Sequence, residues 1–192
     1  MSGVAPRRAT TEPGRANLAE AVRLCAGIGP FLAEMRGLYE EADRRVARGP
    51  DRCLGGGGCC KFDLFGHRLY LTAGELAILT LEPPRAKAGP SQWAGFAGAK
   101  GGNGQGKDTR GCRCPYQARG RCGAYARRPL GCRVYFCRPA DPEAPGRTYE
   151  EFHSRMALLH RRFALPYLYV ELTGALTEVL TERQTHRNGS AL

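Results

Sequence analysis

The sequence predicts a mainly α-helical fold: a small, irregular domain in which helices flank a cysteine-rich core that a metal staples together. Apolar residues recur at helical spacing before residue 49 and again after residue 148. Between these stretches stand eight of the nine cysteines, among glycines and prolines that favour turns. Alternation of apolar and polar residues is brief in this middle part, so we expect at most a short β-hairpin there.

The composition allows one compact domain whose thiols stay reduced. The chain has 192 residues, 42% of them hydrophobic, which is enough for a core. Its N-terminus is charged and lacks the apolar stretch of a secretory signal, and no segment reaches the roughly 18 apolar residues of a membrane span. We therefore expect a cytoplasmic protein without membrane contact, in which grouped cysteines act as metal ligands or redox groups.

Tails and one insert mark the limits of the domain. Residues 1–16 and 183–192 are polar and lack periodicity, so we expect disordered tails on both sides of a single cysteine-cluster domain at 17–182. Apolar spacing predicts a last helix at residues 167–182. The segment 83–110 separates the two groups of cysteines, and its glycine content indicates a flexible insert.

The N-terminal half predicts helices followed by a short extended segment. Residues 17–48 carry an apolar stripe, which Gly27 and Pro30 divide into two helices. Cys25 lies on this stripe, and we interpret it as a buried structural thiol rather than a ligand. Alternating apolar residues around Gly66 predict two short strands or a hairpin.

Two capping-box patterns predict helix starts. Thr72 and Glu75 open a short helix that a pair of prolines ends. Thr148 and Glu151 open a longer one, which ends at Pro166. The longer helix has an apolar stripe made of Phe152, Met156, Leu159 and Phe163.

The clustered cysteines are the predicted metal ligands. Thiolates are soft donors that suit zinc or an iron–sulfur cluster, and ligands from two segments would hold the chain around the metal. Structural thiols without metal, and disulfides in an exported protein, are the alternatives. The candidate ligands are Cys53, Cys59 and Cys60 in the first group and Cys112, Cys114, Cys122, Cys132 and Cys137 in the second.

The surroundings of the second group are strongly basic. Residues 110–138 contain eight arginines and no aspartate or glutamate, in a chain of formal net charge +11. A centre with four thiolates carries a formal charge of about −2, which basic neighbours stabilise. Eight arginines are more than one such centre needs, so binding of an anionic partner remains an alternative. The spacing lacks the paired C-x2-C knuckles of a zinc ribbon, which disfavours a simple zinc-finger reading.

The second cysteine group resembles the YkgJ-like cysteine-cluster family, described as a zinc- or iron-chelating domain with a CxxCxxCC motif. The family's second motif has C-P-x-L, then C-x-x-Y-x-x-R-P-x-x-C-R. It matches Cys114, Cys122, Tyr125, Arg128, Pro129, Cys132 and Arg133.

The first motif of the family is C-x2-C-x2-C-C. Cys53, Cys59 and Cys60 fall in register with it, whereas Gly56 occupies the position of the second cysteine. The helix expected over LTAGELAIL is similar to the one that follows this motif in the family. The resemblance covers roughly residues 50–138 and implies metal or iron–sulfur binding, and some relatives are linked to flagellin lysine methylation.

Three functions follow as hypotheses. The first is a metal-binding protein with a redox or accessory role, for which an unknown protein partner remains open. The second is a metal-dependent protein-modifying enzyme or subunit, although the sequence contains no methyl-donor or radical signature. The third is an Arg-rich nucleic-acid binder, for which we expect weak, non-specific binding at most. His153 and His160 share a helix face, as packed side chains or as further metal ligands.

Overall fold

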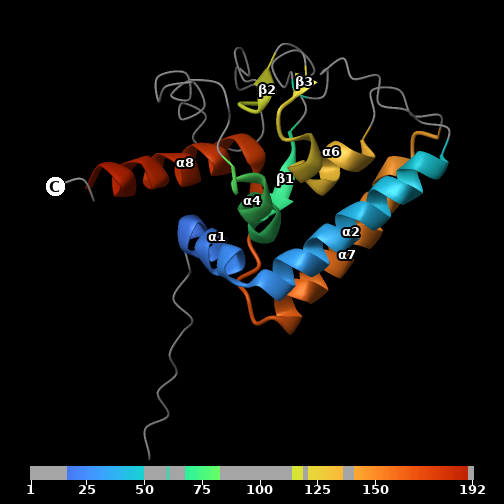
Figure 1. Ribbon diagram of the computed structural model, residues 1–192. Coiled ribbons are helices and arrows are strands. Elements are labelled where there is room, and N and C mark those ends of the chain that lie inside the picture. Colours follow the sequence, from blue (N-terminus) through green and yellow to red (C-terminus); the bar gives the residue numbers. More distant parts are fainter. Residues whose placement is uncertain are drawn as a thin grey trace, which may run out of the picture.

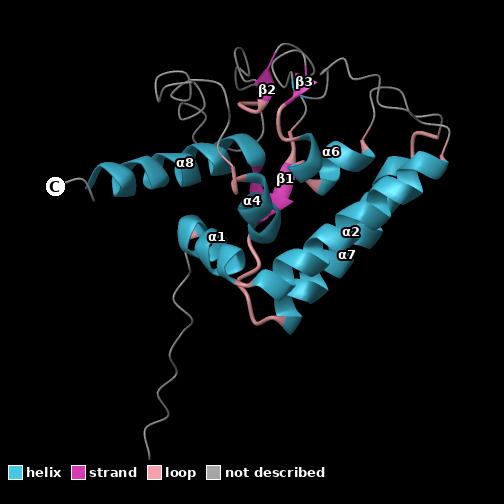
Figure 2. Cartoon of the chain, in the orientation of Figure 1, coloured by secondary structure: helices cyan, strands magenta, loops and turns pink. Residues whose placement is uncertain are grey.

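The computed structural model describes residues 17–49, 60, 68–82, 114–118, 121–135 and 141–189. In these ranges the chain is mainly helical, with six α-helices and two short two-stranded antiparallel sheets (Figure 2). This confirms the fold class predicted from the sequence. None of the described helices is long and apolar enough to cross a membrane. The predicted N-terminal tail and the glycine-rich insert lie outside the described residues.

The first two helices begin and end as the sequence predicts. Helix α1 spans Leu18–Gly27 and α2 spans Gly29–Arg48. The side chain of Asn17 caps α1, and a proline stands in the first turn of α2, where its missing N–H costs no hydrogen bond. Cys25 is fully buried on α1, and burial raises the pKa of its thiol to about 12. This placement confirms its prediction as a buried thiol.

Helix α4 lies at the centre of the fold (Figure 1). It spans Ala73–Leu79, and all seven of its residues are buried. The predicted capping box is present, because the Thr72 hydroxyl accepts the Glu75 N–H and the Glu75 carboxylate accepts the Thr72 N–H. A helix that is buried on every side needs apolar neighbours all round, and α1, α2 and strand β1 pack against it.

The strand before α4 finds its partner far along the chain. Strand β1 (Tyr70–Thr72) pairs antiparallel with β4 (Tyr169–Glu171). Residues 61–67 themselves lie outside the described ranges. Because β4 occupies the start of the predicted last helix, α8 begins later, and it spans Leu172–Gly189. The helix therefore runs past residue 182, where we predicted a tail.

Helix α7 begins earlier than its capping-box pattern predicts. It spans Ala144–Arg162, so Thr148 lies inside the helix. Pro145 in its first turn supplies a backbone angle already set for a helix, and Arg147 binds the acidic residues Asp141 and Glu143 ahead of it. The predicted stripe is confirmed, with Phe152 and Met156 fully buried and Leu159 and Phe163 packed on the core.

Helices α2 and α7 lie side by side and antiparallel (Figure 1). Three ion pairs join the two helices, and the paired residues ascend along α2 while they descend along α7. These pairs are Glu34–Arg162, Glu41–Arg155 and Arg45–Glu151.

The cysteine segment forms a compact layer on one end of this helical body. It consists of β2 (Gln117–Ala118), β3 (Arg121–Cys122), the 3-10 helix η2 (Tyr125–Arg127) and α6 (Leu130–Val134). Helix α6 packs against α2, α7 and β1, while the β2–β3 hairpin projects beyond them (Figure 1). The layer therefore rests on elements from both ends of the sequence.

Substitution of Gly74 tests the packing of α4. A Cβ at this position would stand 2.7 Å from Phe31 Cζ and 2.8 Å from His160 Nε2, both fully buried. We expect Gly74→Ala to lower the free energy of unfolding by about 2 kcal/mol, since overpacking outweighs the gain in helix propensity. In contrast, Gly37→Ala on α2, where nothing lies within 4 Å, should raise it by up to about 1 kcal/mol. Urea unfolding of the two variants measures both changes, and equal effects would contradict this packing.

His160 predicts a pH dependence of stability. It is fully buried, its Nδ1–H donates to the carbonyl of Pro166 at 2.8 Å, and burial lowers its pKa. Stability from the neutral ring is complete above the unfolded pKa of about 6.5 and is lost as the pH falls below it, by at most about 1.4 kcal/mol per pH unit. His160→Asn keeps a donor near Nδ1 but cannot titrate. Unfolding measured between pH 7.5 and pH 5 should therefore show a smaller loss for this variant than for the wild type.

Candidate metal centre

One cysteine of the first group lies next to one of the second in the structure. The backbone N–H of Cys114 donates a hydrogen bond to the backbone carbonyl of Cys60 at 3.0 Å. Cys60 is 7% exposed, and Cys114 packs at the edge of the hydrophobic core. One predicted ligand from the first group thus lies beside one from the second, although a long stretch of sequence separates them.

A tight hairpin brings a further cysteine to this place. The N–H of Gln117 donates to the carbonyl of Cys114 at 2.9 Å, and the hairpin register pairs Gln117 with Cys122. The N–H of Gly123 donates to the Tyr116 carbonyl at 2.7 Å, which continues the pairing past the strands. Cys122 also packs against the core, so the hairpin holds both of its cysteines at its inner end.

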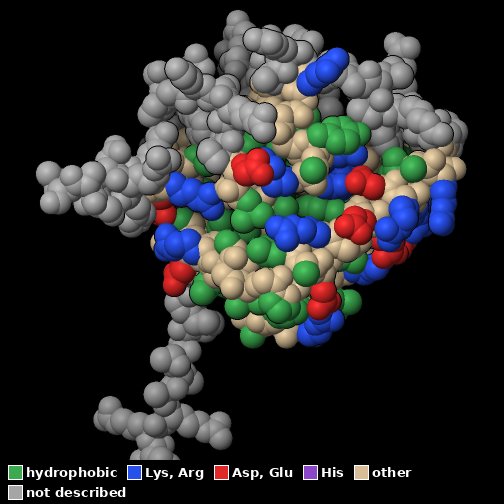
Figure 3. All heavy atoms as spheres, viewed as in Figure 1, with side chains coloured by type: hydrophobic (Ala, Val, Ile, Leu, Met, Phe, Trp, Pro, Cys, Tyr) green, Lys and Arg blue, Asp and Glu red, His purple; other side chains and the backbone are tan. Residues whose placement is uncertain are grey.

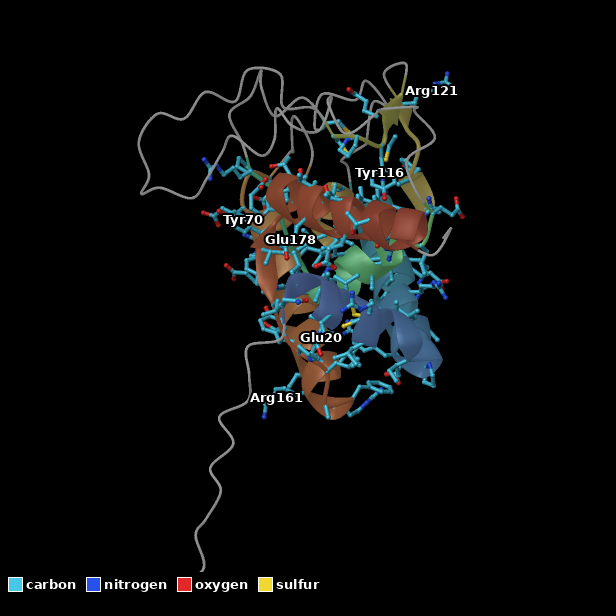
Figure 4. All side chains as sticks on the ribbon, turned by 90° about the vertical axis from the view of Figure 1, so that its left-hand side faces the viewer. Glu20, Tyr70, Tyr116, Arg121, Arg161 and Glu178 are labelled. Carbon is cyan, nitrogen blue, oxygen red and sulfur yellow. The ribbon has the colours of Figure 1, made fainter. Side chains whose placement is uncertain are left out.

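Tyr116 and Arg121 mark the two ends of this hairpin. Tyr116 lies between the hairpin and α8, is 4% exposed and donates its hydroxyl to the Glu82 carbonyl at 3.3 Å (Figure 4). Arg121 points away from the body at the outer end (Figure 4). The inner end of the hairpin is therefore anchored in the core.

Cys132 lies on α6, whose start is fixed by a buried carboxylate. Pro129 is the N-cap residue, and the N–H of Leu130 donates to Glu75 Oε1 at 2.8 Å. The other oxygen of Glu75 accepts the Thr72 N–H at 2.8 Å. Burial raises the pKa of Glu75, while these backbone hydrogen bonds act in the opposite direction. One side chain of α4 thus sets the position of the helix that carries Cys132.

The residue after Cys132 is a buried arginine with four contacts. Arg133 is 3% exposed, and its Nε and one terminal NH2 group donate to the carbonyls of Arg128 at 2.8 Å and Ala126 at 2.7 Å. The other terminal nitrogen pairs with Asp43 on α2. Its guanidinium carbon lies 4.1 Å above the ring centre of Tyr39. Arg133 therefore closes the loop before α6 and fastens it to α2.

Three arginines of this segment form ion pairs with carboxylates from other parts of the chain. Arg128 also pairs with Asp43, at 3.3 Å, and Arg127 pairs with Glu82 at 2.9 Å. We expected the arginines to serve the metal centre or an anionic partner, and these three instead hold the segment to its neighbours. On the face in Figure 3, basic and acidic side chains are interspersed rather than gathered into one basic patch.

The described residues contain only part of a ligand set. Four candidates, Cys53, Cys59, Cys112 and Cys137, lie outside them, and among the described residues no three His, Cys, Asp or Glu side chains form a group that could hold a metal ion. Three buried donors around this segment lack an acceptor in the same ranges: the Tyr39 hydroxyl and the Nε atoms of Arg127 and Arg128. Donors of this kind suit anionic thiolates, but the described residues alone do not form a metal site.

The two helix histidines have other contacts. His160 is enclosed in the core as described, and Nε2 of His153 forms a hydrogen bond of 2.8 Å with the Tyr167 hydroxyl. His153 stacks on Tyr149, whose hydroxyl lies 2.8 Å from that of Tyr169. We did not predict this aromatic cluster, although tyrosines at alternate positions near residue 168 could have indicated it. It joins α7 to β4, and Tyr149 also pairs with Tyr135 at the end of α6, with ring centres 5.7 Å apart.

Comparison of the chain with family models, curated proteins and solved structures gave no match. The resemblance to the YkgJ-like family therefore stays a prediction from the motif residues.

Asp43 is a testable anchor of the cysteine segment. We expect Asp43→Asn to lower the free energy of unfolding by about 2 kcal/mol, because it leaves the buried Arg133 without its counter-charge. The matched control is Glu40→Gln on the same helix, whose ion pair with Arg44 is exposed and 3.9 Å long. It should change stability by less than about 0.5 kcal/mol. Chemical denaturation distinguishes the two, and a small effect at Asp43 would show that the segment is held by other contacts.

Proposed function

We propose that this chain is a metal-binding protein whose clustered cysteines hold an iron–sulfur cluster or a zinc ion. The observation that supports this most is the hydrogen bond between Cys114 and Cys60, which brings the two cysteine groups together. Cys122 and Cys132 complete the described part of the ligand set, and cysteines outside the described residues supply the rest. The metal would add its binding free energy to that of folding and hold the two segments in place.

The proposal includes a redox or accessory role in a reducing compartment such as the cytoplasm. Free thiolates in such numbers are open to oxidation, and a metal protects them. The structure offers less support for nucleic-acid binding, because arginines of the basic segment form ion pairs within the protein. Binding to nucleic acid should accordingly be weak and independent of sequence.

Metal analysis of anaerobically purified protein tests this function. We expect iron and acid-labile sulfide with visible absorbance, or zinc when the protein is purified in air. Zinc and iron–sulfur clusters are distinguished by the spectrum, since zinc has no visible colour. A folded protein that contains neither metal after anaerobic purification would contradict the proposal.

Single substitutions of the described cysteines should separate ligands from core residues. We expect Cys114→Ser and Cys132→Ser to lower the metal content and the melting temperature together, because metal binding and folding are coupled. Cys25→Ser should leave the metal content unchanged, since this thiol is buried on α1. Its hydroxyl would lower stability without affecting the metal. Metal loss in Cys25→Ser equal to that in Cys132→Ser would refute the ligand assignment.

A further inference from the structure

Six aromatic side chains form one cluster where strands β1 and β4 meet helix α7 and the end of α6. Neighbouring ring centres lie between 4.7 Å apart, for His153 and Tyr169, and 6.1 Å apart, for His153 and Tyr167. Two of the contacts are stacks, of Tyr70 on Tyr169 and of Tyr149 on His153. The members of this aromatic cluster are Tyr70, Tyr135, Tyr149, His153, Tyr167 and Tyr169.

The aromatic cluster is open to solvent and held in place by hydrogen bonds. The Tyr149 hydroxyl lies 2.8 Å from that of Tyr169. The Tyr167 hydroxyl lies 2.8 Å from Nε2 of His153. Exposed aromatic side chains that stand together mark an interaction site, and tyrosine contributes strongly to binding when a partner covers it. The members that are 40–45% exposed are Tyr70 (Figure 4), Tyr135, Tyr167 and Tyr169.

No cation from the described residues lies over these rings. Elsewhere in the same ranges, arginines lie 3.9–5.0 Å above the centres of four aromatic rings, those of Tyr125, Tyr39, Phe152 and Phe163. The face of a tyrosine ring carries partial negative charge, which attracts a guanidinium. In a chain this rich in arginine, the aromatic cluster therefore presents its faces to a cation from outside.

A carboxylate on β4 stands beside the cluster. Glu171 is directly across from Tyr70 in the β1–β4 ladder, so the two side chains lie on the same face. Its Oε2 accepts hydrogen bonds from the Thr173 hydroxyl at 2.6 Å and from the Gly174 N–H at 2.9 Å. Among the described residues no cation pairs with Glu171, so its charge is available to a guest on the rings.

A second carboxylate approaches the cluster from α7. Glu150 lies one helical turn before His153, so the two share a side of the helix. Its charge adds to the effects of burial and of Tyr169, which raise the pKa of Tyr135. The next residue, Glu151, pairs with an arginine of α2, whereas Glu150 forms no ion pair with a described residue. Aromatic faces and two carboxylates together make a surface that is complementary to a cation.

We propose that the aromatic cluster is a docking site for an arginine side chain of a partner polypeptide, whose guanidinium lies over the exposed tyrosine rings and pairs with Glu150 or Glu171. A guanidinium is planar, so it can stack on an aromatic face while it donates two N–H groups to a carboxylate. The ammonium of lysine is more strongly hydrated and cannot do both.

The size and charge of the surface define the partner further. Exposed rings on β1, on β4 and at the end of α6 extend beyond what one guanidinium covers, so residues on either side of the arginine contact the remaining rings. Because the whole chain carries a formal net charge of +11, recognition depends on contact at the cluster and not on long-range attraction. The inference does not depend on the metal.

Titration of the full-length chain with a short peptide tests this inference. The probe is Gly-Ser-Arg-Gly-Ser-Arg-Gly with blocked ends, and its control carries citrulline, which has the same shape without the charge, at both arginine positions. Chemical shifts of the tyrosine rings, followed by NMR, give the Kd. We expect the arginine peptide to bind at least about 10-fold more tightly than the citrulline peptide, with a lysine peptide in between.

Paired variants locate the site. Tyr70→Leu removes a ring but keeps an apolar side chain, and it should weaken binding of the arginine peptide roughly 2–5-fold. Tyr70→Phe keeps the aromatic face and should bind within about twofold of the wild type. Glu150→Gln should weaken binding to a similar extent as Tyr70→Leu, whereas Glu40→Gln, at an exposed acid of α2, should not. Circular dichroism checks that each variant is folded.

Four results would overturn the inference. The first is equal affinity for the arginine and citrulline peptides, which the wild-type chain decides even if the Tyr70 variants fail to fold. The second is unchanged binding by both Tyr70→Leu and Glu150→Gln. The third is self-association that shifts the same rings and is lost in Tyr70→Leu, since a second copy would then occupy the surface. The fourth is a shift of these rings by oligothymidylate but not by the arginine peptide, which would assign the surface to single-stranded nucleic acid.

Discussion

The carboxylate of Glu75 joins two helices that are distant in sequence. One oxygen accepts a backbone N–H at the start of α4 and the other accepts one at the start of α6, each at 2.8 Å. The first N–H groups of a helix have no partner within it, and their dipoles favour a negative charge. A single buried side chain therefore satisfies donors of both helices. Because α4 is buried on all sides, its Glu75 carboxylate fixes the position of α6 relative to the core.

A second electrostatic contact also holds α6 in place. Asp43 on α2 binds both Arg128 and Arg133, which flank the turn that leads into α6. A buried guanidinium whose partner is removed is costly, so α2 and the cysteine segment are expected to fold as one unit. The Arg133 donors also bind two loop carbonyls, those of Arg128 and Ala126. Together, the two carboxylates add electrostatic contacts to the apolar packing of Leu130 and Val134, which α6 buries in the core.

The sequence predicted features that depend on near neighbours and missed those that depend on distant ones. The break at Gly27 and Pro30 and the capping box of α4 are local, and both are confirmed. The start of α7 was wrong because Thr148 fits a capping box as well as it fits a helix interior. Strand β4 was missed because its partner is β1, nearly a hundred positions earlier. No periodicity within residues 167–182 signals such a pairing.

The role of the arginines could not be predicted for a similar reason. Charge counting in the basic segment indicated counter-ions for thiolates, yet the acids that bind these arginines stand on α2 and next to α4. For the candidate site, the sequence could name the cysteines but not their supports. Cys60 and Cys114 are joined by a backbone hydrogen bond. Such a bond does not depend on which side chains are present, so the sequence does not reveal it.

The R-P-x-x-C-R pattern also has an explanation that requires no metal. Pro129 begins α6, and Arg133 reaches back to the carbonyl of Arg128, so the spacing between the two arginines is set by the closure of this loop. Cys132 stands inside the closed loop and takes its position from it. A ligand held in this way loses little conformational freedom when a metal binds, and less of the binding free energy is spent on ordering it. Under the proposed function, the arginines of the pattern would act on metal affinity only by fixing the loop that positions Cys132, without touching the metal.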